Sequence, residues 1–208
     1  MSDLASFYFT NDSEYEIKGY CADGEFIKSS THKGLPLVSI EDVGRIFPSA
    51  HYHAFVAVGY SKLNEIRKNK FNYFKSHQYQ LASYLSSKSS YWNESLQVGE
   101  NVFLMENNVI QPYSSIGDNV LIWVNNMIAH HSVLDSHTTI TSHVVMGGGV
   151  KIGSSCFIGS NATLRDGIEI APHTIIGASS NVVRSILKPG LYIGNPALYK
   201  SETSAVEL

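Results

Sequence analysis

From residue 98 onward, every sixth residue of the chain is aliphatic or methionine. The series begins at Val98 and ends at Val182, and its fifteen positions contain no gap or insertion. Glycine often follows the aliphatic residue, and a small or β-branched residue often stands two positions before the next one. In an α-helix, residues six apart lie about 120° away from a common face, so this pattern excludes a helix.

The six-residue period predicts a parallel β-solenoid. Each hexapeptide would form a short strand and a corner with its aliphatic side chain inside, and three hexapeptides would complete a coil of 18 residues. Fifteen hexapeptides then form five coils, in which residues 18 apart stack on one face. We expect glycine at corners that need a positive φ or a close backbone approach. An ordinary β-sandwich, the alternative, would alternate with period two.

The first third of the chain has a different pattern, in which apolar runs of strand length alternate with helical periodicity. Strands are expected over residues 14–21, 53–59 and 80–86, and helices over 40–46 and 62–78. This alternation predicts a small parallel α/β unit. We therefore expect three regions: an α/β domain over residues 1–88, a β-solenoid over 89–184, and a closing strand with a C-terminal tail over 185–208.

Composition narrows the class of function. Hydrophobic residues make up 43% of the 208 residues, which is enough for a buried core, and charged residues only 16%. A net charge of -3 lacks the basic surplus that nucleic-acid binding requires. No apolar run reaches the length of a membrane span, and the N-terminus has no signal-peptide pattern, so we expect a soluble cytoplasmic protein.

A turn in the first third has features of a phosphate site. Gly59 and Ser61 lie where a predicted strand ends and a predicted helix begins, and backbone N–H groups at such a point favour a diphosphate. Arg67 lies on the same predicted helix, within reach of a phosphate. An ordinary structural turn with a solvated basic helix face is the alternative.

The solenoid contains a cluster of histidines, the usual general base at neutral pH. His131, His137 and His143 are six apart, so they would occupy corners of three different faces and could not form one metal site. His130 is out of this series, and the residue 18 positions after it is Gly148. A base one coil from a backbone N–H without a side chain suits acyl transfer, in which the amide stabilises an oxyanion. Any single histidine could instead be a polar corner residue.

Two segments resemble a known family, the hexapeptide-repeat acyltransferases. Its coils wind left-handed, and its members are usually trimers. The matching segments are Ile128-Ala129-His130-His131-Ser132-Val133, which resembles the family's general-base motif, and Leu191-Tyr192-Ile193-Gly194-Asn195-Pro196-Ala197, which resembles its closing motif. With the α/β unit, the chain is similar to nucleotide-sugar acetyltransferases of the sialic acid O-acetyltransferase-like group.

The resemblance implies a mainly β protein. The expected fold is a left-handed parallel β-helix of about five coils, preceded by a small Rossmann-like α/β domain. That domain is expected to be truncated, because the family's first strand and Gly-rich loop have no counterpart before Asp3, where the first helix is expected to begin.

The resemblance also implies catalytic roles. His130 would be the general base, and Gly148 would present its amide to the oxyanion. The residue after the base is usually acidic in the family but is His131 here, and a second family histidine is replaced by Thr139. We expect Asp135 or a neighbouring subunit to supply the missing charge, or else a weaker base.

Binding residues follow from the same resemblance. Asp23 would contact the base or ribose of a nucleotide, and the turn at Gly59 its diphosphate. The groove for acetyl-CoA would be lined by residues of successive coils: Thr139, Gly148, Ser160 and Ala178.

The leading hypothesis is acetyl-CoA-dependent N-acetylation of a nucleotide-linked amino-deoxy sugar for surface polysaccharide, in a homotrimer with active sites between subunits. One alternative keeps acetyl-CoA and makes a sugar hydroxyl the acceptor. A second is a non-catalytic β-helix scaffold. A zinc site like that of γ-carbonic anhydrases is disfavoured because the corners separate the histidines, and no metal is expected.

Overall fold

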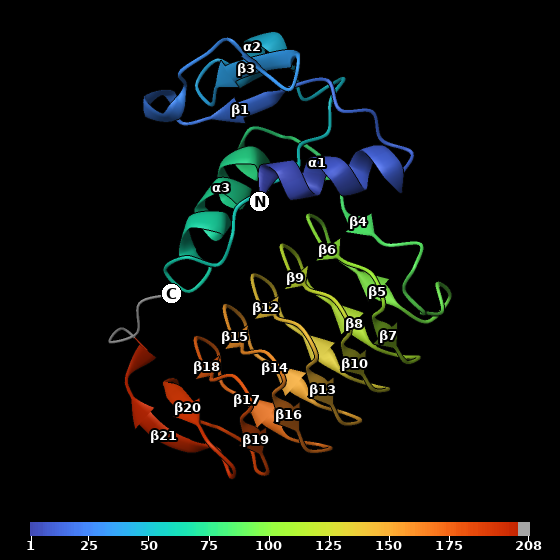
Figure 1. The fold of residues 1–208 in the computed structure, drawn as a ribbon, viewed down its shortest axis with the longest axis vertical. Coiled ribbons are helices and arrows are strands. Elements are labelled where there is room, and N and C mark those ends of the chain that lie inside the picture. The colour runs from blue at the N-terminus through green and yellow to red at the C-terminus, as the bar shows by residue number, and fades with distance from the viewer. Residues whose placement is uncertain (204–208) are drawn as a thin grey trace.

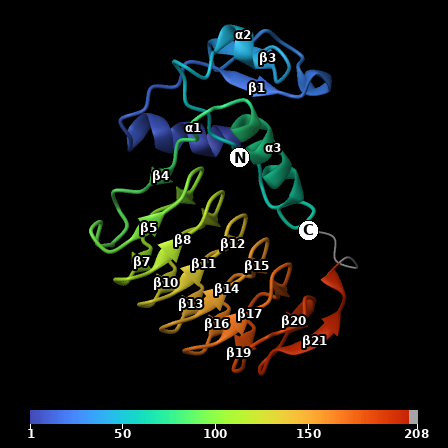
Figure 2. The ribbon, with the colours of Figure 1, turned by 180° about the vertical axis from the view of Figure 1, so that it is seen from behind.

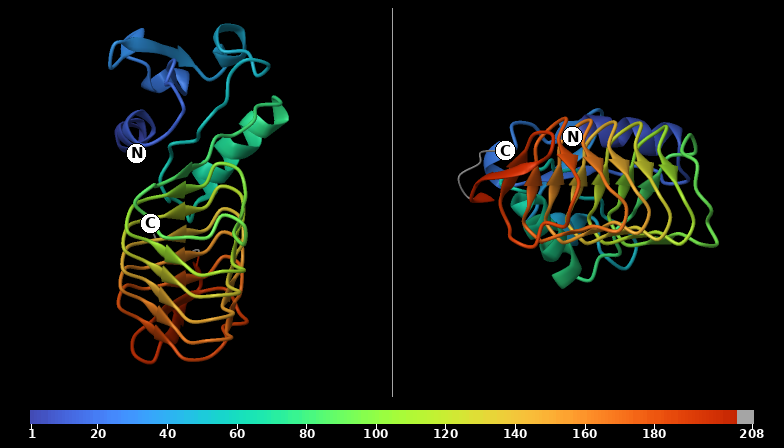
Figure 3. Two further views of the ribbon diagram at one scale, coloured as in Figure 1. Left: turned by 90° about the vertical axis from the view of Figure 1, so that its right-hand side faces the viewer. Right: turned by 90° about the horizontal axis from the view of Figure 1, so that it is seen from below.

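The computed structural model describes residues 1–203 and places a small α/β unit at one end of a long β-helix (Figure 1). Two-residue strands form the three sides of this prism, and each side is a parallel sheet (Figure 3). Sheet 1 contains β4 (Tyr84–Leu85), β6 (Phe103–Leu104), β9 (Leu121–Ile122), β12 (Thr139–Ile140), β15 (Phe157–Ile158) and β18 (Ile175–Ile176), and it is extended by β20 (Leu191–Ile193) and β21 (Leu198–Ser201).

The other two sides contain five strands each. Sheet 2 consists of β7 (Val109–Ile110), β10 (Met127–Ile128), β13 (Val145–Met146), β16 (Thr163–Leu164) and β19 (Asn181–Val182). Sheet 3 consists of β5 (Gln97–Val98), β8 (Ser115–Ile116), β11 (Val133–Leu134), β14 (Lys151–Ile152) and β17 (Glu169–Ile170). Because the chain visits the sheets in turn, the prism has three edges, which we call the 1–2, 2–3 and 3–1 corners after the sheets they join.

The register confirms the predicted coil length. Met127 of β10 pairs with Val145 of β13, 18 residues further along, and the pairs between the middle coils keep this offset. The offset changes only at the two ends of the prism: Tyr84 pairs with Phe103, and Ile175 pairs with Leu191. The regular register therefore belongs to the middle coils.

The six-residue series forms the core, as predicted. From Leu104 to Val182 each of its members is at most 3% exposed, and Val98 at the start is half-buried. The small residues two positions before them are also buried, among them Ser132, Cys156 and Ala162. Each coil therefore contributes two layers of side chains to a core that is continuous along the prism.

The expected role of the glycines is only half right. Those that follow the aliphatic residue do not have a positive φ. They allow close approach: a Cβ on Gly117 would lie 2.7 Å from the backbone N of Ser136 in the next coil. The positive φ falls two residues later in each hexapeptide, usually on asparagine, histidine or serine; Asn119 and His137 have φ of 58° and 66°.

The N-terminal unit differs from the predicted parallel α/β domain. Its sheet has three strands in the order β1-β3-β2 (β1 Tyr20–Ala22, β2 Thr31–His32 and β3 Leu35–Ser39), and β2 runs antiparallel to β3. Residues 14–19 are not a strand, and residues 53–59 are extended with only the isolated bridge Ala54–Leu81. Of the expected strand 80–86, β4 is the part that forms.

Two helices join this unit to the prism (Figure 2). Phe9 of α1 (Ser2–Asn11) packs with Tyr84 and Phe103 on the first coils. Asp12 accepts hydrogen bonds from Tyr84 Oη at 2.6 Å and from the backbone N of Ser87 at 3.0 Å. The predicted helices 40–46 and 62–78 are shorter: α2 (Val43–Ile46) and α3 (Glu65–Ser76), with a 3-10 turn η1 (Gly24–Phe26) before β2. None of the helices in residues 1–203 has the length and apolarity to cross a membrane.

Replacing Gly117 by alanine should destabilise the β-helix. The added methyl would meet backbone of the next coil, which can move only if the ladder shifts, so we expect the free energy of unfolding to fall by about 1–3 kcal/mol. Gly24→Ala is the control, because a Cβ there meets nothing within 4 Å. Urea unfolding measures both variants; equal stability of the two would contradict the close-stacking account.

Candidate functional site

The predicted base and the predicted amide lie together at the 2–3 corner. His130 follows β10, and its imidazole lies over Gly148 in the next coil. A Cβ on Gly148 would come within 2.6 Å of Cε1 and 2.8 Å of Nε2 of His130. Only glycine therefore leaves room for the ring in this position. The pairing across 18 residues is as the stacking argument predicted.

The imidazole of His130 is held by its sequence neighbour. Nδ1 of His130 and Nδ1 of His131 are 3.0 Å apart, and the two rings meet edge to face at 86°. The ring of His131 packs in turn on Tyr113, one coil earlier, with centroids 5.0 Å apart. All three side chains are exposed at this corner. The corner thus presents a solvent-facing histidine pair with an aromatic backing.

The Gly148 amide already has a partner. It donates a hydrogen bond of 2.7 Å to Oδ1 of Asp166, one coil further on. The same bond joins the backbone N of Glu100 to Asp118 at 2.8 Å, at a corner without a histidine, so it is a stacking feature of this fold. Sequence reasoning missed Asp166, although the 18-residue rule that linked His130 to Gly148 also reaches it.

Two predicted groove residues lie on another edge. Ser160 and Ala178 stack on each other at the 1–2 corner, and both are exposed. The Ser160 hydroxyl donates to Oγ1 of Thr141 at 3.1 Å. Sheet 2 separates this corner from the 2–3 corner that contains His130. Within one chain, the predicted groove and the predicted base are therefore not brought together.

The third predicted groove residue, Thr139, is not on an open surface in this chain. It is fully buried in β12, under the start of α3. Its hydroxyl donates to Oδ1 of Asn64 at 2.6 Å and accepts from Nη2 of Arg67 at 3.1 Å. The N-terminal unit docks at the place where an open groove was expected.

Arg67 is also not where a phosphate contact would be. Its side chain is buried, and the guanidinium donates to the backbone carbonyls of Gly59 at 3.1 Å and Asn119 at 3.2 Å, among others. Burial lowers its pKa to about 10. The residue bolts α3 to the β-helix, because it joins the segment before the helix to two coils. Its aliphatic periodicity with exposed neighbours gave no sign of this.

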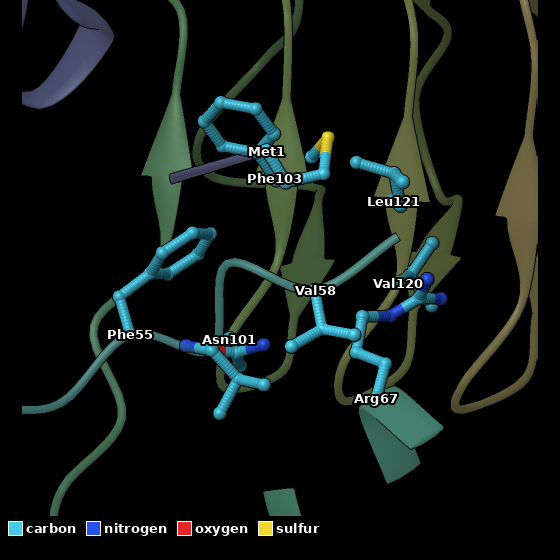
Figure 4. A pocket seen from close by; sticks show the side chains of 9 residues that line it. Met1, Phe55, Val58, Arg67, Asn101, Phe103, Val120 and Leu121 are labelled. Atoms are coloured by element: carbon cyan, nitrogen blue, oxygen red, sulfur yellow. The ribbon is translucent and has the colours of Figure 1, made fainter. Parts of the chain in front are cut away.

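A small cavity borders this arginine (Figure 4). Its volume is about 10 Å³, and its walls are mostly apolar; Met1, Phe55 and Val58 line it together with Arg67. Such a space holds about one water molecule. It is therefore a packing gap between the extended segment and sheet 1.

The other predicted nucleotide contacts lie around α3. Gly59 is half-buried beside Met1, and Ser61 is exposed. Between Ser61 and the helix, three consecutive residues have a positive φ, an arrangement that L-residues rarely adopt: Lys62, Leu63 and Asn64. Asp23, after β1, forms an ion pair with Lys70 of α3. The roles of Asp23, Gly59 and Ser61 stay predictions.

The remaining histidines are dispersed, as predicted. His131, His137 and His143 occupy three different corners with φ near 60°, and among residues 1–203 no three His, Cys, Asp or Glu side chains are placed to hold a metal ion. Asp135, expected as a substitute for the missing carboxylate, follows β11 and so lies at the 3–1 corner. It is the wrong edge, and no contact joins it to His130.

His137 belongs to the docking of α3. Its Nδ1 is 2.9 Å from Nδ2 of Asn119, and its ring packs edge to face on Phe71. Burial, followed by the nearby charges of Lys68 and Arg67, lowers its pKa to about 4. It is therefore a neutral structural histidine at physiological pH.

Comparison with known proteins agrees with this architecture. Residues 149–184 match the model of the family described as bacterial transferase hexapeptide (six repeats). No curated protein matches the sequence. The predicted resemblance to hexapeptide-repeat acyltransferases is confirmed, and with it the left-handed β-helix.

Solved structures match most of the chain. A point variant of perosamine N-acetyltransferase from Caulobacter crescentus, in complex with CoA and GDP-perosamine, is 25% identical, with a TM-score of 0.79 over 88% of this chain and 85% of that one. The acetyltransferase domain of PglB from Neisseria gonorrhoeae is 21% identical, with a TM-score of 0.78 over 88% and 86%. WeeI from Acinetobacter baumannii is 19% identical, with a TM-score of 0.77 over 96% and 92%. The last two matches show a shared fold.

Arg67→Met should destabilise the protein strongly. The substitution leaves several buried carbonyls without a donor, so we expect the free energy of unfolding to fall by about 2–4 kcal/mol. Lys68→Met, on the same helix, is the control and should change it little. If Arg67→Met unfolded like the wild-type chain, the residue would be free for a ligand.

Unfolding should become easier in acid because of His137. The unfolded chain binds a proton at this residue near the ordinary value of 6.5, whereas its pKa in the folded chain is about 4. The unfolded state therefore takes up the proton first, and stability falls as the pH drops from 6.5 toward about 4. His137→Asn should flatten this dependence in urea titrations across that range. An unchanged slope would contradict the assignment.

Proposed function

We propose that this chain is an acetyl-CoA-dependent N-acetyltransferase that acts on the amino group of a nucleotide-linked amino-deoxy sugar. The observation that carries the proposal is the imidazole of His130 over Gly148 at an exposed corner. The similar perosamine N-acetyltransferase, which was solved with CoA and GDP-perosamine, supports both the donor and the class of acceptor. Nothing in the proposed reaction needs a metal ion.

His130 acts as the general base in this proposal. Its Nδ1 is engaged with His131, so Nε2 is the nitrogen that can take a proton. The neutral amine nitrogen attacks the thioester carbonyl carbon, and its proton passes to Nε2. When the C–S bond breaks, the thiolate leaves and receives this proton. The products are the N-acetylated sugar and free CoA, and His130 is neutral again.

Gly148 supplies the oxyanion amide in the proposal. Because its N–H is bonded to Asp166 before substrate enters, that carboxylate has to turn away when the thioester carbonyl arrives. A carboxylate left beside the developing oxyanion would repel it, so this movement is part of assembling the site. Asp166 is exposed and free to move toward solvent.

The active site is proposed to form between subunits of a homotrimer. One chain places Ser160 and Ala178 on a different edge from His130, so a groove that contains all three requires a second copy. Sheet 2, which lies between these two edges, has an apolar outer face: Val109 and Val145 are 43% and 46% exposed. Packing this face against a neighbour would bring one chain's 1–2 corner to another's 2–3 corner.

The N-terminal unit is proposed to hold the nucleotide. Asp23, Gly59 and Ser61 remain available for this role, whereas Arg67 does not. Because acetyl-CoA is a cytoplasmic metabolite, the proposal places the reaction in the cytoplasm. The product would serve surface polysaccharide synthesis.

Release of free CoA tests the proposal directly. Purified protein is incubated with acetyl-CoA and a panel of nucleotide-linked 3-amino and 4-amino sugars, and the thiol is followed with a colorimetric reagent. We expect release with an amino sugar, and His130→Ala should lower kcat by about 10²–10⁴-fold. His173→Ala, an exposed histidine at the 3–1 corner, is the control and should behave like the wild-type chain.

The other outcomes separate the alternatives. Release with a hydroxy sugar alone would indicate O-acetylation. Binding of acetyl-CoA without any release would remove amino sugars as acceptors. No binding of acetyl-CoA would favour a scaffold. A kcat unaffected by His130→Ala would remove His130 from the mechanism.

A further inference from the structure

We propose that His131 is a positioning residue, whose neutral imidazole accepts the Nδ1–H of His130 and so fixes the tautomer in which Nε2 is a base. This inference rests on the proposed function, in which His130 takes the proton. It assigns to a histidine the task for which a carboxylate was expected, and it makes the state of His131 part of the activity of this chain.

The distance between the rings requires a shared proton. Nδ1 of His130 and Nδ1 of His131 are 3.0 Å apart, which is a hydrogen-bond distance. Two lone pairs, or two N–H groups, would repel each other at this separation. One nitrogen therefore donates and the other accepts.

The direction of the bond decides whether His130 can act as a base. If His131 donated, neutral His130 would have its proton on Nε2, the nitrogen next to Gly148 that must accept. If His130 donates, its Nε2 is bare and His131 has its proton on the outer nitrogen. Only the second arrangement agrees with general-base catalysis by His130.

The surroundings of His131 hold its ring in place. Tyr113 packs on it with an interplanar angle of 37°. The backbone of His131 adopts φ 59°, and its N–H donates to the carbonyl of Pro112 at 3.2 Å. His130 is fixed as well, because its own backbone N–H donates to Oε1 of Gln111 at 3.0 Å. The two rings therefore face each other with little freedom to rotate apart.

The substitution of a histidine for a carboxylate changes the response to acid. A carboxylate remains an acceptor in mildly acidic solution, whereas His131 gains a proton there and then presents N–H to N–H. The other titratable groups that reach the pair and Gly148 are the Tyr113 phenol and the Asp166 carboxylate, and the neighbouring Arg165 bonds to the Val183 carbonyl. Neither Tyr113 nor Asp166 bonds to His131, so the pair itself governs the acid limb.

The tautomer can be measured without any substrate. Nitrogen NMR of the full chain with ¹⁵N-labelled histidine reports which ring nitrogen is protonated, and single variants at positions 130 and 131 assign the signals. We expect His130 protonated on Nδ1 and His131 on Nε2 at pH about 8. His130 found with its proton on Nε2 would overturn the proposal. This readout is independent of whether an acceptor sugar has been identified.

Two substitutions separate positioning from packing. His131→Asn keeps an acceptor oxygen and a residue type that tolerates positive φ, whereas His131→Phe keeps the ring and removes the acceptor. Tyr113, with φ 65° in the preceding coil, shows that an aromatic residue fits this backbone. We expect kcat to fall about 10–100-fold in His131→Phe and much less in His131→Asn, with KM little changed in both.

The pH profile adds a second criterion. The acid limb of kcat should be steeper in the wild-type chain than in His131→Asn, because the former loses activity through two histidines and the latter through one. Equal kcat in wild type and His131→Phe, or an equal loss in both variants, would overturn the proposal. If the wild-type chain acetylates no sugar, the proposed function fails, while the NMR result still decides the tautomer.

Discussion

Stacking of parallel coils at one strand spacing, about 4.8 Å, is the constraint on which the rest of this molecule depends. With an offset of 18 residues, every side chain in the middle coils has a fixed neighbour above and below. Inside the prism this requires aliphatic side chains, and where a corner closes tightly it requires glycine. At the 2–3 corner the same constraint places His130, Gly148 and Asp166 in one column. The candidate chemistry is therefore a property of the stacking before it is a property of any single residue.

The 3–1 corner and sheet 1 are used for a different purpose. Asn64 and Arg67 of the segment around α3 reach backbone groups of several coils, and His137 packs under the same helix. Burying a guanidinium without a carboxylate is unfavourable, and its many bonds to carbonyls offset that cost. The N-terminal unit is thus fixed by polar contacts that are specific in geometry. This explains why Thr139 and Arg67, both predicted to meet ligands, meet each other.

The prism was predictable and the N-terminal unit much less so. A six-residue period leaves one solution for inward and outward side chains, so Leu104 to Val182, the corner histidines and the His130–Gly148 pair followed from spacing alone. Residues 53–59 have the composition of a buried strand, but α1 and sheet 1 cover them instead of a neighbouring strand. Arg67 could not be identified as buried, because its neighbours Lys68 and Lys70 indicate a solvated face. Asp166 could have been found, since stacking reaches it.

The change of register at the two ends of the prism limits how such a chain can alter its length. In the middle coils, one inserted residue would turn every later side chain onto a different face and separate His130 from Gly148. Insertions or deletions there are compatible with the fold only in whole turns. At the ends, where Tyr84 pairs with Phe103 and Ile175 with Leu191, the pairing already departs from the regular offset. Variation among descendants of this chain should therefore accumulate at the first and last turns, while the turns that contain the histidine pair keep their length.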